Sequence, residues 1–281
     1  MIIIKSRGEL GNQIFQYGAA KKALQEGESL VLVGFHQLCR TFPKLSRKTV
    51  TYAYGKKATK RVQKVWQWLE NQESLGRLGR LHETRNGVSA HRTRGSIRGV
   101  TLAEGFFQDP DSLDWRSIDE LVKAFQSTTS PPANSKNLEK GRMTCFVHVR
   151  RGDYLSWPSP ESPAALPSQW YQAQMRAVTE WAHPNPVDFH VFSDNRELAA
   201  QEIGRQPNVL IHDGTVEEDF AAMCSAQAGI LSASTFSWWA AYFASRKSSG
   251  PFFAPKYWLG FRQQEWQPES LRAEFLTFVD V

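Results

Sequence analysis

Two adjacent arginines follow an apolar stretch of the sequence, and their placement suits an anionic ligand. Residues 145–154 read Cys-Phe-Val-His-Val-Arg-Arg-Gly-Asp-Tyr. Guanidinium groups repel each other, so Arg150 and Arg151 beside His148 at the end of a strand favour an anion, and the planar fork of arginine fits phosphate through two hydrogen bonds. The spacing also allows another arrangement, in which Asp153 and a second acid hold the arginines in ion pairs.

A second segment combines small hydroxyl residues with the start of a helix. Residues 229–242 read Gly-Ile-Leu-Ser-Ala-Ser-Thr-Phe-Ser-Trp-Trp-Ala-Ala-Tyr, which predicts a strand, a turn and a helix. Ser234 or Thr235 is expected at the N-cap. Because a helix N-terminus presents free backbone N–H groups, and hydroxyls add donors, this segment predicts an anion site. An ordinary capped helix with Trp238 and Trp239 in the core fits the same residues.

Two shorter segments place polar groups after apolar runs. Residues 7–17 (Arg-Gly-Glu-Leu-Gly-Asn-Gln-Ile-Phe-Gln-Tyr) form a glycine loop that matches neither a dinucleotide fingerprint nor a Walker A loop. In it, Asn12 either caps the next helix or points into a cleft. Residues 191–195 read Val-Phe-Ser-Asp-Asn, where the Asp194 carboxylate could accept the N1–H and N2–H groups of guanine. Capping of the following helix by Asp194 or Asn195 is the alternative.

Hydrophobic periodicity predicts the elements that position these residues. In the first half we expect strands at 2–6 and 29–34 and helices at 12–25, 59–71 and 119–126. In the second half we expect strands at 144–149, 188–193, 208–212 and 229–233 and helices at 168–181, 197–204, 216–226 and 236–246. This regular alternation predicts parallel sheets with helices on both faces.

The Ser-, Pro- and Asn-rich residues 127–137 are the expected linker between two domains. We place these domains at residues 1–135 and 136–281, as two α/β domains that face each other across a cleft. The charge balance also changes sign near the linker, because residues 1–140 carry a net charge of +10 and residues 141–281 a net charge of −4.

Composition excludes several classes of protein. The chain has 281 residues, of which 41% are apolar and 22% charged, as in globular proteins and unlike disordered, collagenous or coiled-coil chains. No run of 18 residues is continuously apolar, which argues against a spanning helix. The apolar run at the N-terminus is too short for a signal peptide, so we expect a cytoplasmic protein.

Most of the positive charge lies in residues 40–98, which carry 15 basic and 3 acidic side chains, a net charge of +12. Such a field attracts nucleic acid, anionic lipid or another acidic surface. A solvated basic face without a partner is the alternative. No recognised nucleic-acid-binding motif accompanies the charge, so a basic nucleic-acid-binding protein is the most distant of the functions considered.

Taken together, these segments resemble the bacterial α-1,2-fucosyltransferases of glycosyltransferase family 11. The matching features are the glycine loop at 8–17, the His-x-Arg-Arg-Gly-Asp-Tyr run at 148–154, the Phe-Ser-Asp-Asn run at 192–195 and the segment from Asp219 to Trp239. The likeness extends over nearly the whole chain and is weakest in residues 40–100. Departures from the family pattern are Glu9 in the glycine loop and Asn195 where the family usually has Asp.

The resemblance implies a GT-B-like fold of two Rossmann-like domains, with GDP-fucose bound by the C-terminal one and the acceptor by the N-terminal one. It implies inverting transfer of L-fucose from GDP-β-L-fucose to the 2-hydroxyl of a galactose-containing oligosaccharide or lipid-linked glycan. No metal ion and no other cofactor is expected, because related fucosyltransferases need none. A related enzyme that uses another nucleotide sugar, or makes another linkage, is the alternative.

Residue roles follow from the same resemblance. Arg150 would clamp the diphosphate, with Arg151 either supporting it or structural. Ser234, Thr235 and the Phe236 backbone N–H would complete the cradle for the diphosphate. His148 and Asp194 would read guanine and ribose.

The resemblance also implies roles on the acceptor side. The acceptor-side residues are expected to be Gly11, Asn12 and Gln13, with Asn12 near the diphosphate or the acceptor. The general base stays open: Asp153 is the carboxylate candidate, and holding the arginines is its alternative role. Lipid-linked acceptors would also give the basic region a function, as a peripheral contact with an anionic membrane.

Overall fold

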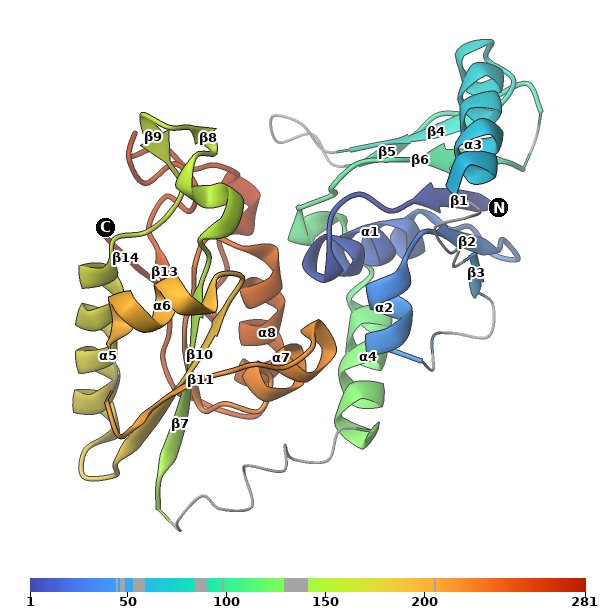
Figure 1. The fold of residues 1–281 in the computed structure, drawn as a ribbon. Coiled ribbons are helices and arrows are strands. Elements are labelled where there is room, and N and C mark those ends of the chain that lie inside the picture. Colours follow the sequence, from blue (N-terminus) through green and yellow to red (C-terminus); the bar gives the residue numbers. More distant parts are fainter. Residues whose placement is uncertain are drawn as a thin grey trace. The chain divides into compact units, whose positions relative to one another are not determined.

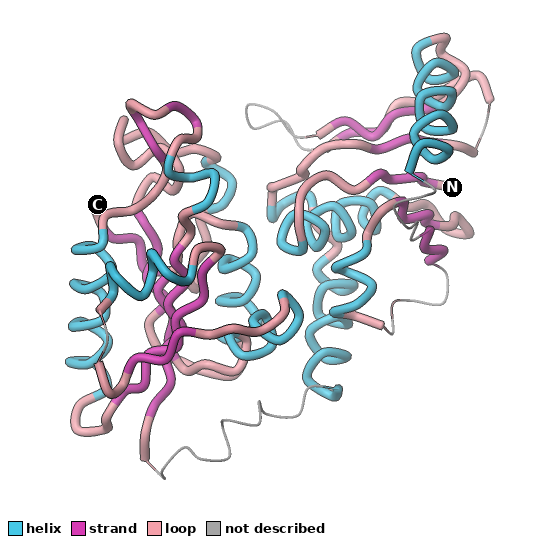
Figure 2. Tube along the Cα trace, viewed as in Figure 1, coloured by secondary structure: helices cyan, strands magenta, loops and turns pink. Residues whose placement is uncertain are grey.

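A computed structural model describes residues 1–43, 45, 49–52, 59–83, 90–97, 99–128, 141–204 and 206–281. The chain divides into two compact units, Met1–Thr128 (unit 1) and Thr129–Val281 (unit 2). The expected domain boundary, between residues 135 and 136, lies outside the described residues. Each unit contains a mainly parallel sheet and helices, as expected for two Rossmann-like domains (Figures 1 and 2).

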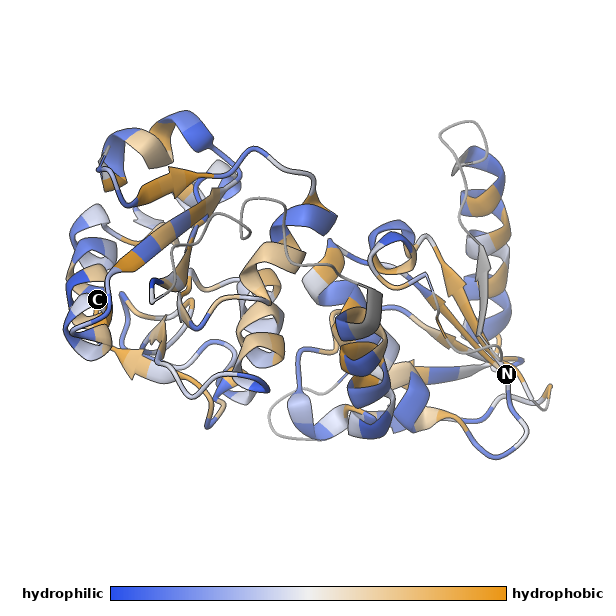
Figure 3. Cartoon of the chain, turned by 90° about the horizontal axis from the view of Figure 1, so that it is seen from below, coloured by the Kyte–Doolittle hydropathy of each residue, from blue (hydrophilic) through white to orange (hydrophobic). Residues whose placement is uncertain are grey.

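Unit 1 is built on a six-stranded sheet with the order β3-β2-β1-β6-β4-β5. Its strands are β1 (Ile2–Lys5), β2 (Leu30–Val33), β3 (Thr49–Tyr52), β4 (Gly79–His82), β5 (His91–Arg92) and β6 (Thr101–Ala103). All neighbouring pairs are parallel except β4 and β5. In Figure 3 the strands near the N-terminus are largely hydrophobic, as buried parallel strands must be.

Helices cover this sheet and connect its strands. They are α1 (Leu10–Ala23), α2 (His36–Thr41), α3 (Thr59–Ser74) and α4 (Trp115–Thr128). On α3, Trp66 packs with Leu78 and Leu102 against one face of the sheet. The predicted strands at 2–6 and 29–34 and the helices at 12–25, 59–71 and 119–126 are confirmed with shifted ends. The strands β3 to β6 were not predicted, because each is short and lacks clear alternation.

Unit 2 is built on an all-parallel sheet with the order β11-β10-β7-β12-β13-β14. Its strands are β7 (Met143–Val149), β10 (Val187–Ser193), β11 (Val209–Ile211), β12 (Ala228–Ile230), β13 (Phe252–Pro255) and β14 (Thr277–Val279). Its helices are α5 (Ser168–Ala182), α6 (Arg196–Ile203), α7 (Val216–Met223) and α8 (Thr235–Ser245). A small hairpin, β8 (Pro158–Ser159) with β9 (Ser162–Pro163), stands apart from the sheet.

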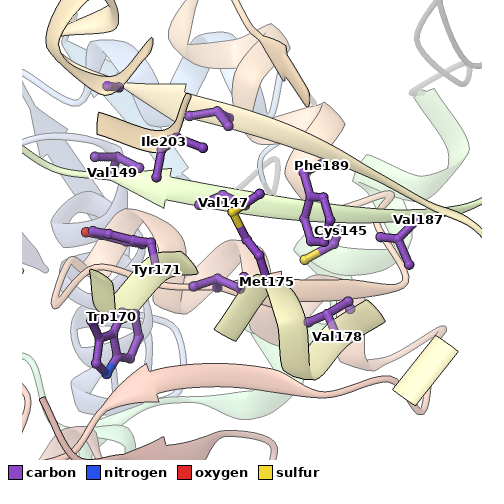
Figure 4. Close-up of a cluster of buried hydrophobic side chains, with 14 of the residues drawn as sticks. Cys145, Val147, Val149, Trp170, Tyr171, Met175, Val178, Val187, Phe189 and Ile203 are labelled. Atoms are coloured by element: carbon purple, nitrogen blue, oxygen red, sulfur yellow. The ribbon is translucent and has the colours of Figure 1, made fainter. Parts of the chain in front are cut away.

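The core of unit 2 lies between the sheet and helices α5 and α6. Figure 4 shows Cys145, Val147 and Val149 of β7 beside Tyr171 and Met175 of α5, and all but Met175 are less than 4% exposed. The four strands and four helices predicted for this half are confirmed. Strands β13 and β14 were missed, because they are short and follow long irregular segments. Among the helices that the structure describes, none is long and apolar enough to cross a membrane.

Candidate active site

The carboxyl ends of three neighbouring strands bring the predicted donor residues together in unit 2. Arg150 follows β7, Asp194 follows β10 and Ser232 follows β12. Val149 is paired with Ser193, so the residues that follow these two strands lie side by side. Ligands of parallel α/β sheets bind at this edge, where the loops after the strands meet.

Arg150 lies between two carboxylates at this edge. Its Nη2 donates to Asp153 Oδ1 at 2.7 Å, and its Nε lies 3.2 Å from Asp194 Oδ2. Burial alone would lower the pKa of Arg150, but Asp194 and Asp153 outweigh it and the pKa is raised, so the group stays charged. Of its five N–H donors, those on Nη1 have no hydrogen-bond partner within the described part of the chain. The side chain is 34% exposed, and its free donors can bind an anion.

Arg151 is placed differently from its neighbour. Its side chain is 1% exposed, and its Nε and Nη2 donate to Glu202 Oε2 of α6 at 2.7 and 2.5 Å. The guanidinium also lies 5.6 Å from the Tyr171 ring centroid and donates to the Arg150 carbonyl. Of the two roles left open by the sequence, this geometry favours the structural one, because a guanidinium held this way has little access to a ligand.

Asp194, directly after β10, contacts both arginines. Its Oδ1 accepts the backbone N–H of Arg151 at 2.7 Å, while its Oδ2 faces the Arg150 guanidinium. A Cβ on Gly152 would collide with that Oδ2 atom, so glycine leaves the space in which the carboxylate lies. The following helix is capped by Asn195, whose side chain accepts the N–H of Leu198. The structure thus assigns the cap to Asn195 and leaves Asp194 on the arginines.

Ser232, which the sequence analysis did not assign, joins this edge from β12. Its buried hydroxyl donates to the His148 carbonyl at 2.6 Å, accepts the Arg150 N–H at 2.8 Å, and lies 2.8 Å from the Tyr171 hydroxyl. Tyr154 contributes from the next turn, where its hydroxyl donates to the Ala233 carbonyl. Only the serine-rich composition of 229–242 hinted at Ser232, because its partners are far away in sequence.

Helix α8 begins beside Ser232 as predicted. Ser234 is its N-cap, and its side chain accepts the Phe236 N–H at 3.4 Å. Ser237 is buried and donates to the carbonyls of Ser232 and Ser234. Thr235 and Phe236 form the first turn and are half-buried. The start of this eleven-residue helix therefore points its positive dipole end at the edge that carries Arg150.

Two buried polar atoms near this edge have no hydrogen-bond partner among the described residues. They are Nδ1 of His148 and Oδ1 of Asp219. Burial, together with the charge of Arg150, lowers the pKa of His148 to about 3, so its ring is neutral. Burial raises the pKa of Asp219 to about 6, although the charge of Arg196 and a backbone hydrogen bond from Gly214 to this carboxyl act in the opposite direction. Asp219 packs against Gly214 in the loop after β11, at the same edge of the sheet. A buried polar atom without a protein partner faces a ligand or an ordered water in many proteins, so these two atoms are candidates for ligand contacts.

In unit 1, the predicted acceptor-side residues lie at the start of α1. Gln13 is buried, donates to the Gly8 carbonyl and accepts the Leu38 N–H, so it holds the glycine loop. Gly11 is buried too. Asn12 is half-buried and accepts from Gln108 at 2.8 Å. Gly8 has a φ of 76°, which accounts for the glycine in this turn.

Unit 1 also contains a cavity of about 670 Å³ that the sequence analysis missed. It is lined by residues at or after the ends of β1, β4 and β6 and by part of β5: Arg7, Arg80, Leu81, His82, Glu83, His91 and Glu104. The Arg7 guanidinium lies 4.5 Å from the Phe106 ring centroid, and the His82 and His91 rings stack at 4.7 Å. Glu104 is paired with Lys5 at 3.0 Å. Charged groups and imidazoles together suit a polyhydroxylated ligand.

No group of three or more His, Cys, Asp or Glu side chains within the described ranges could hold a metal ion.

Comparison with known proteins agrees with this arrangement. The model of glycosyl transferase family 11 matches residues 101–259. The O-antigen biosynthesis glycosyltransferase WbnK of Escherichia coli is 29% identical over 104 residues, which are 35% of this chain and 34% of that protein. Galactoside alpha-(1,2)-fucosyltransferase 1 of Homo sapiens is 29% identical over 139 residues, 45% of this chain and 36% of that protein.

The fold has a counterpart among solved structures. The crystal structure of the fucosyltransferase NodZ from Bradyrhizobium matches with a TM-score of 0.51 and 14% identity, over 85% of this chain and 91% of that chain. This likeness supports the expected GT-B-like fold class. The chain spans about a third of the length of the curated relatives it matches. Since the family model covers more than half of the sequence, including Arg150, Asp194, Ser232 and Asp219, the chain belongs to glycosyl transferase family 11.

Proposed function

We propose that the protein transfers L-fucose from GDP-β-L-fucose to the 2-hydroxyl of a galactose-containing glycan, with inversion at the anomeric carbon and without a metal ion. The observation that carries the proposal is Arg150, which two carboxylates hold at the carboxyl edge of the sheet with Nη1 available to an anion. Membership of family 11 and relatives named alpha-(1,2)-fucosyltransferase support the reaction.

Unit 2 provides the groups that would stabilise GDP as it leaves the fucose. As the bond between the fucose anomeric carbon and the β-phosphate oxygen breaks, negative charge grows on the diphosphate. The Arg150 guanidinium and the first turn of α8 offer fixed donors to that charge. Because Asp153 and Asp194 hold Arg150 in place, little reorganisation is needed as the charge develops.

The two orphaned polar atoms are suited to the nucleotide base. Guanine presents the N1–H and N2–H donors on one edge and the O6 and N7 acceptors on another. The Asp219 carboxylate accepts the first pair when it is ionised, and the neutral His148 ring offers a further polar contact. We therefore assign guanine recognition to Asp219 and His148, and we reassign Asp194, expected to read guanine and ribose, to positioning Arg150.

The acceptor is assigned to unit 1. Its cavity combines the Arg7 guanidinium, the Glu83 carboxylate and the stacked imidazoles, which match sugar hydroxyls with donors and acceptors. Asn12 is proposed as a contact to the acceptor, whereas Gln13 shapes the loop. The relative named for O-antigen biosynthesis supports an O-antigen glycan as the acceptor.

We propose Asp153 as the base that removes the proton of the acceptor hydroxyl. In this role its carboxylate must first leave the Arg150 guanidinium. Its carboxylate is bound to Arg150 at 2.7 Å, although its side chain is 59% exposed. Bound diphosphate would compete for that guanidinium and leave the Asp153 carboxylate available to accept a proton. If Asp153 is the base, Asp153→Asn abolishes transfer and leaves GDP binding intact; loss of both in equal measure assigns it to holding Arg150.

The proposal is tested by incubating the protein with GDP-fucose and a panel of β-galactosides, such as lactose and N-acetyllactosamine, in the presence of EDTA. The expected product carries α-linked fucose on O2 of galactose, identified by mass spectrometry and NMR. GDP-mannose and UDP-galactose run in parallel as donor controls. Faster transfer from either control donor, or full loss of activity with EDTA, contradicts the proposal.

A further inference from the structure

Helix α3 presents an apolar ridge to solvent on the face that points away from the sheet. Trp68 and Val65 are each 59% exposed and Leu75, in the turn that ends the helix, is 65% exposed. On the opposite face Trp66 is 3% exposed and packs against the sheet with Leu102. Leaving such large apolar side chains in water is costly, so this face is a candidate for a binding surface.

The ridge extends beyond the helix. Ile97 is 50% exposed, and its backbone N–H donates to the Arg77 carbonyl just after Leu75. Among the described residues of unit 1, Val65, Trp68, Leu75 and Ile97 are the exposed large apolar side chains, and all lie on α3 or next to its C-terminal end. Their clustering on one element argues against chance exposure.

Basic side chains surround this ridge. The exposed cations of α3 and the adjoining turns are Lys60, Arg61, Lys64, Arg77 and Arg94. Arg61, Lys64 and Trp68 are spaced at i, i+3 and i+7, so they share the outer face of the helix. The described acids near it are engaged elsewhere: Glu73 pairs with Arg80 at 3.2 Å, and Glu83 accepts the N–H of Phe107. Glu70, the other acid of α3, is half-buried and is hydrogen-bonded to Glu104.

We propose that α3 docks unit 1 on an anionic lipid surface. Trp68, Val65 and Leu75 enter the interface between headgroups and acyl chains, while Arg61 and Lys64 lie along lipid phosphates. Complementary charge identifies the occupant, because the described cations beside the ridge outnumber the acids near it, and the sequence of residues 40–98 carries a net charge of +12. Nucleic acid would pair with the same cations but would gain nothing from the aliphatic Leu75, so a lipid surface accounts for more of the exposed residues.

The test is sedimentation of the full chain with vesicles of phosphatidylcholine and phosphatidylglycerol, compared with phosphatidylcholine alone, at low and high salt. Two variants probe the helix, Trp68→Ser and the double variant Arg61→Glu, Lys64→Glu. Helix α5 supplies matched controls, because Trp181 and Arg176 are exposed there too. We expect the double charge reversal to weaken vesicle binding at least 25-fold, since each basic residue near a lipid surface contributes about fivefold. Trp181→Ser and Arg176→Glu should bind as the parent does.

Several results would overturn the proposal. Equal binding to neutral vesicles excludes the electrostatic component, and unchanged binding by Trp68→Ser excludes insertion of the ridge. If the chain ignores every vesicle but binds an RNA oligonucleotide at low salt, the surface belongs to nucleic acid. Fucosyl transfer to a soluble acceptor is measured on the same preparations. The α3 variants should retain this transfer, so a failure of vesicle binding can be told apart from a failure of the proposed function.

Discussion

At the scale of single residues, the most informative contrast is between Arg150 and Arg151. Adjacent in sequence, they have side chains that are 34% and 1% exposed. The buried one is neutralised by Glu202 and supports the fold, whereas the other keeps donors free for an anion. The two adjacent arginines therefore differ in their contacts, and we expect only Arg150 to bind a phosphate.

Gly152→Ala tests whether Asp194 acts by positioning Arg150. An added Cβ collides with Asp194 Oδ2, a side-chain atom that can move, so the fold should survive. Displacing Asp194 leaves Arg150 misplaced by a fraction of an ångström, and we expect kcat/KM for the donor to fall about tenfold to a hundredfold. Circular dichroism should give an unchanged melting profile. Wild-type kinetics in this variant would show that the Asp194 contact is dispensable.

Asp219→Asn tests guanine recognition through its pH dependence. The folded-state pKa of Asp219, about 6, lies above its unfolded value, so ionisation costs stability as the pH rises through 6. The variant should therefore be more stable than the wild type at pH 8, by about 1 kcal/mol after allowance for solvent screening. Its affinity for GDP should be low and flat with pH, whereas the wild type should lose affinity below pH 6.

Calorimetric titration of GDP between pH 5 and 8, with urea unfolding of both proteins, measures both effects. A variant that is less stable and binds GDP normally would assign Asp219 to the fold.

At the scale of elements, Ser232 joins β12, β7 and α5 through one buried hydroxyl. Ser232→Ala leaves the Arg150 N–H without its partner, whereas the His148 carbonyl keeps the backbone N–H of residue 232. We expect a loss of about 2 kcal/mol in the free energy of unfolding. Tyr171→Phe removes one of the three contacts and should cost about 1 kcal/mol. Chemical denaturation checks both values, and equal costs for the two variants would contradict this hierarchy.

Much at this scale was predictable from the sequence. Long apolar runs such as 144–149 and 188–193 predicted strands, and helical spacing of apolar residues predicted α5, α7 and α8. The period and length of the hydrophobic pattern are enough to predict buried regular elements. Polar residues after those strands gave Arg150, Asp194 and Ser234. Ser232, Tyr171 and Glu202 were missed, since their importance arises from contacts between residues 51 to 84 positions apart.

At the scale of the whole molecule, the two units carry different parts of the proposed reaction. Arg7→Ala removes a guanidinium from the unit 1 cavity and leaves the Arg150 edge untouched. We expect the KM for the acceptor to rise about tenfold, the loss of one charge-assisted hydrogen bond, with the KM for GDP-fucose unchanged. Initial-rate kinetics with each substrate varied in turn give both constants. If the KM for GDP-fucose changed instead, the assignment of the acceptor to this cavity would be wrong.

The central claim is that Arg150 clamps the leaving diphosphate. Its most direct test compares fucosyl transfer by the wild type, Arg150→Ala and the exposed control Arg176→Ala under saturating acceptor. Loss of a donor to the developing charge costs about 3 kcal/mol, so Arg150→Ala should be slower by about a hundredfold or more while it melts normally. The control should match the wild type. A folded Arg150→Ala protein that retains most of its transfer rate would contradict the account.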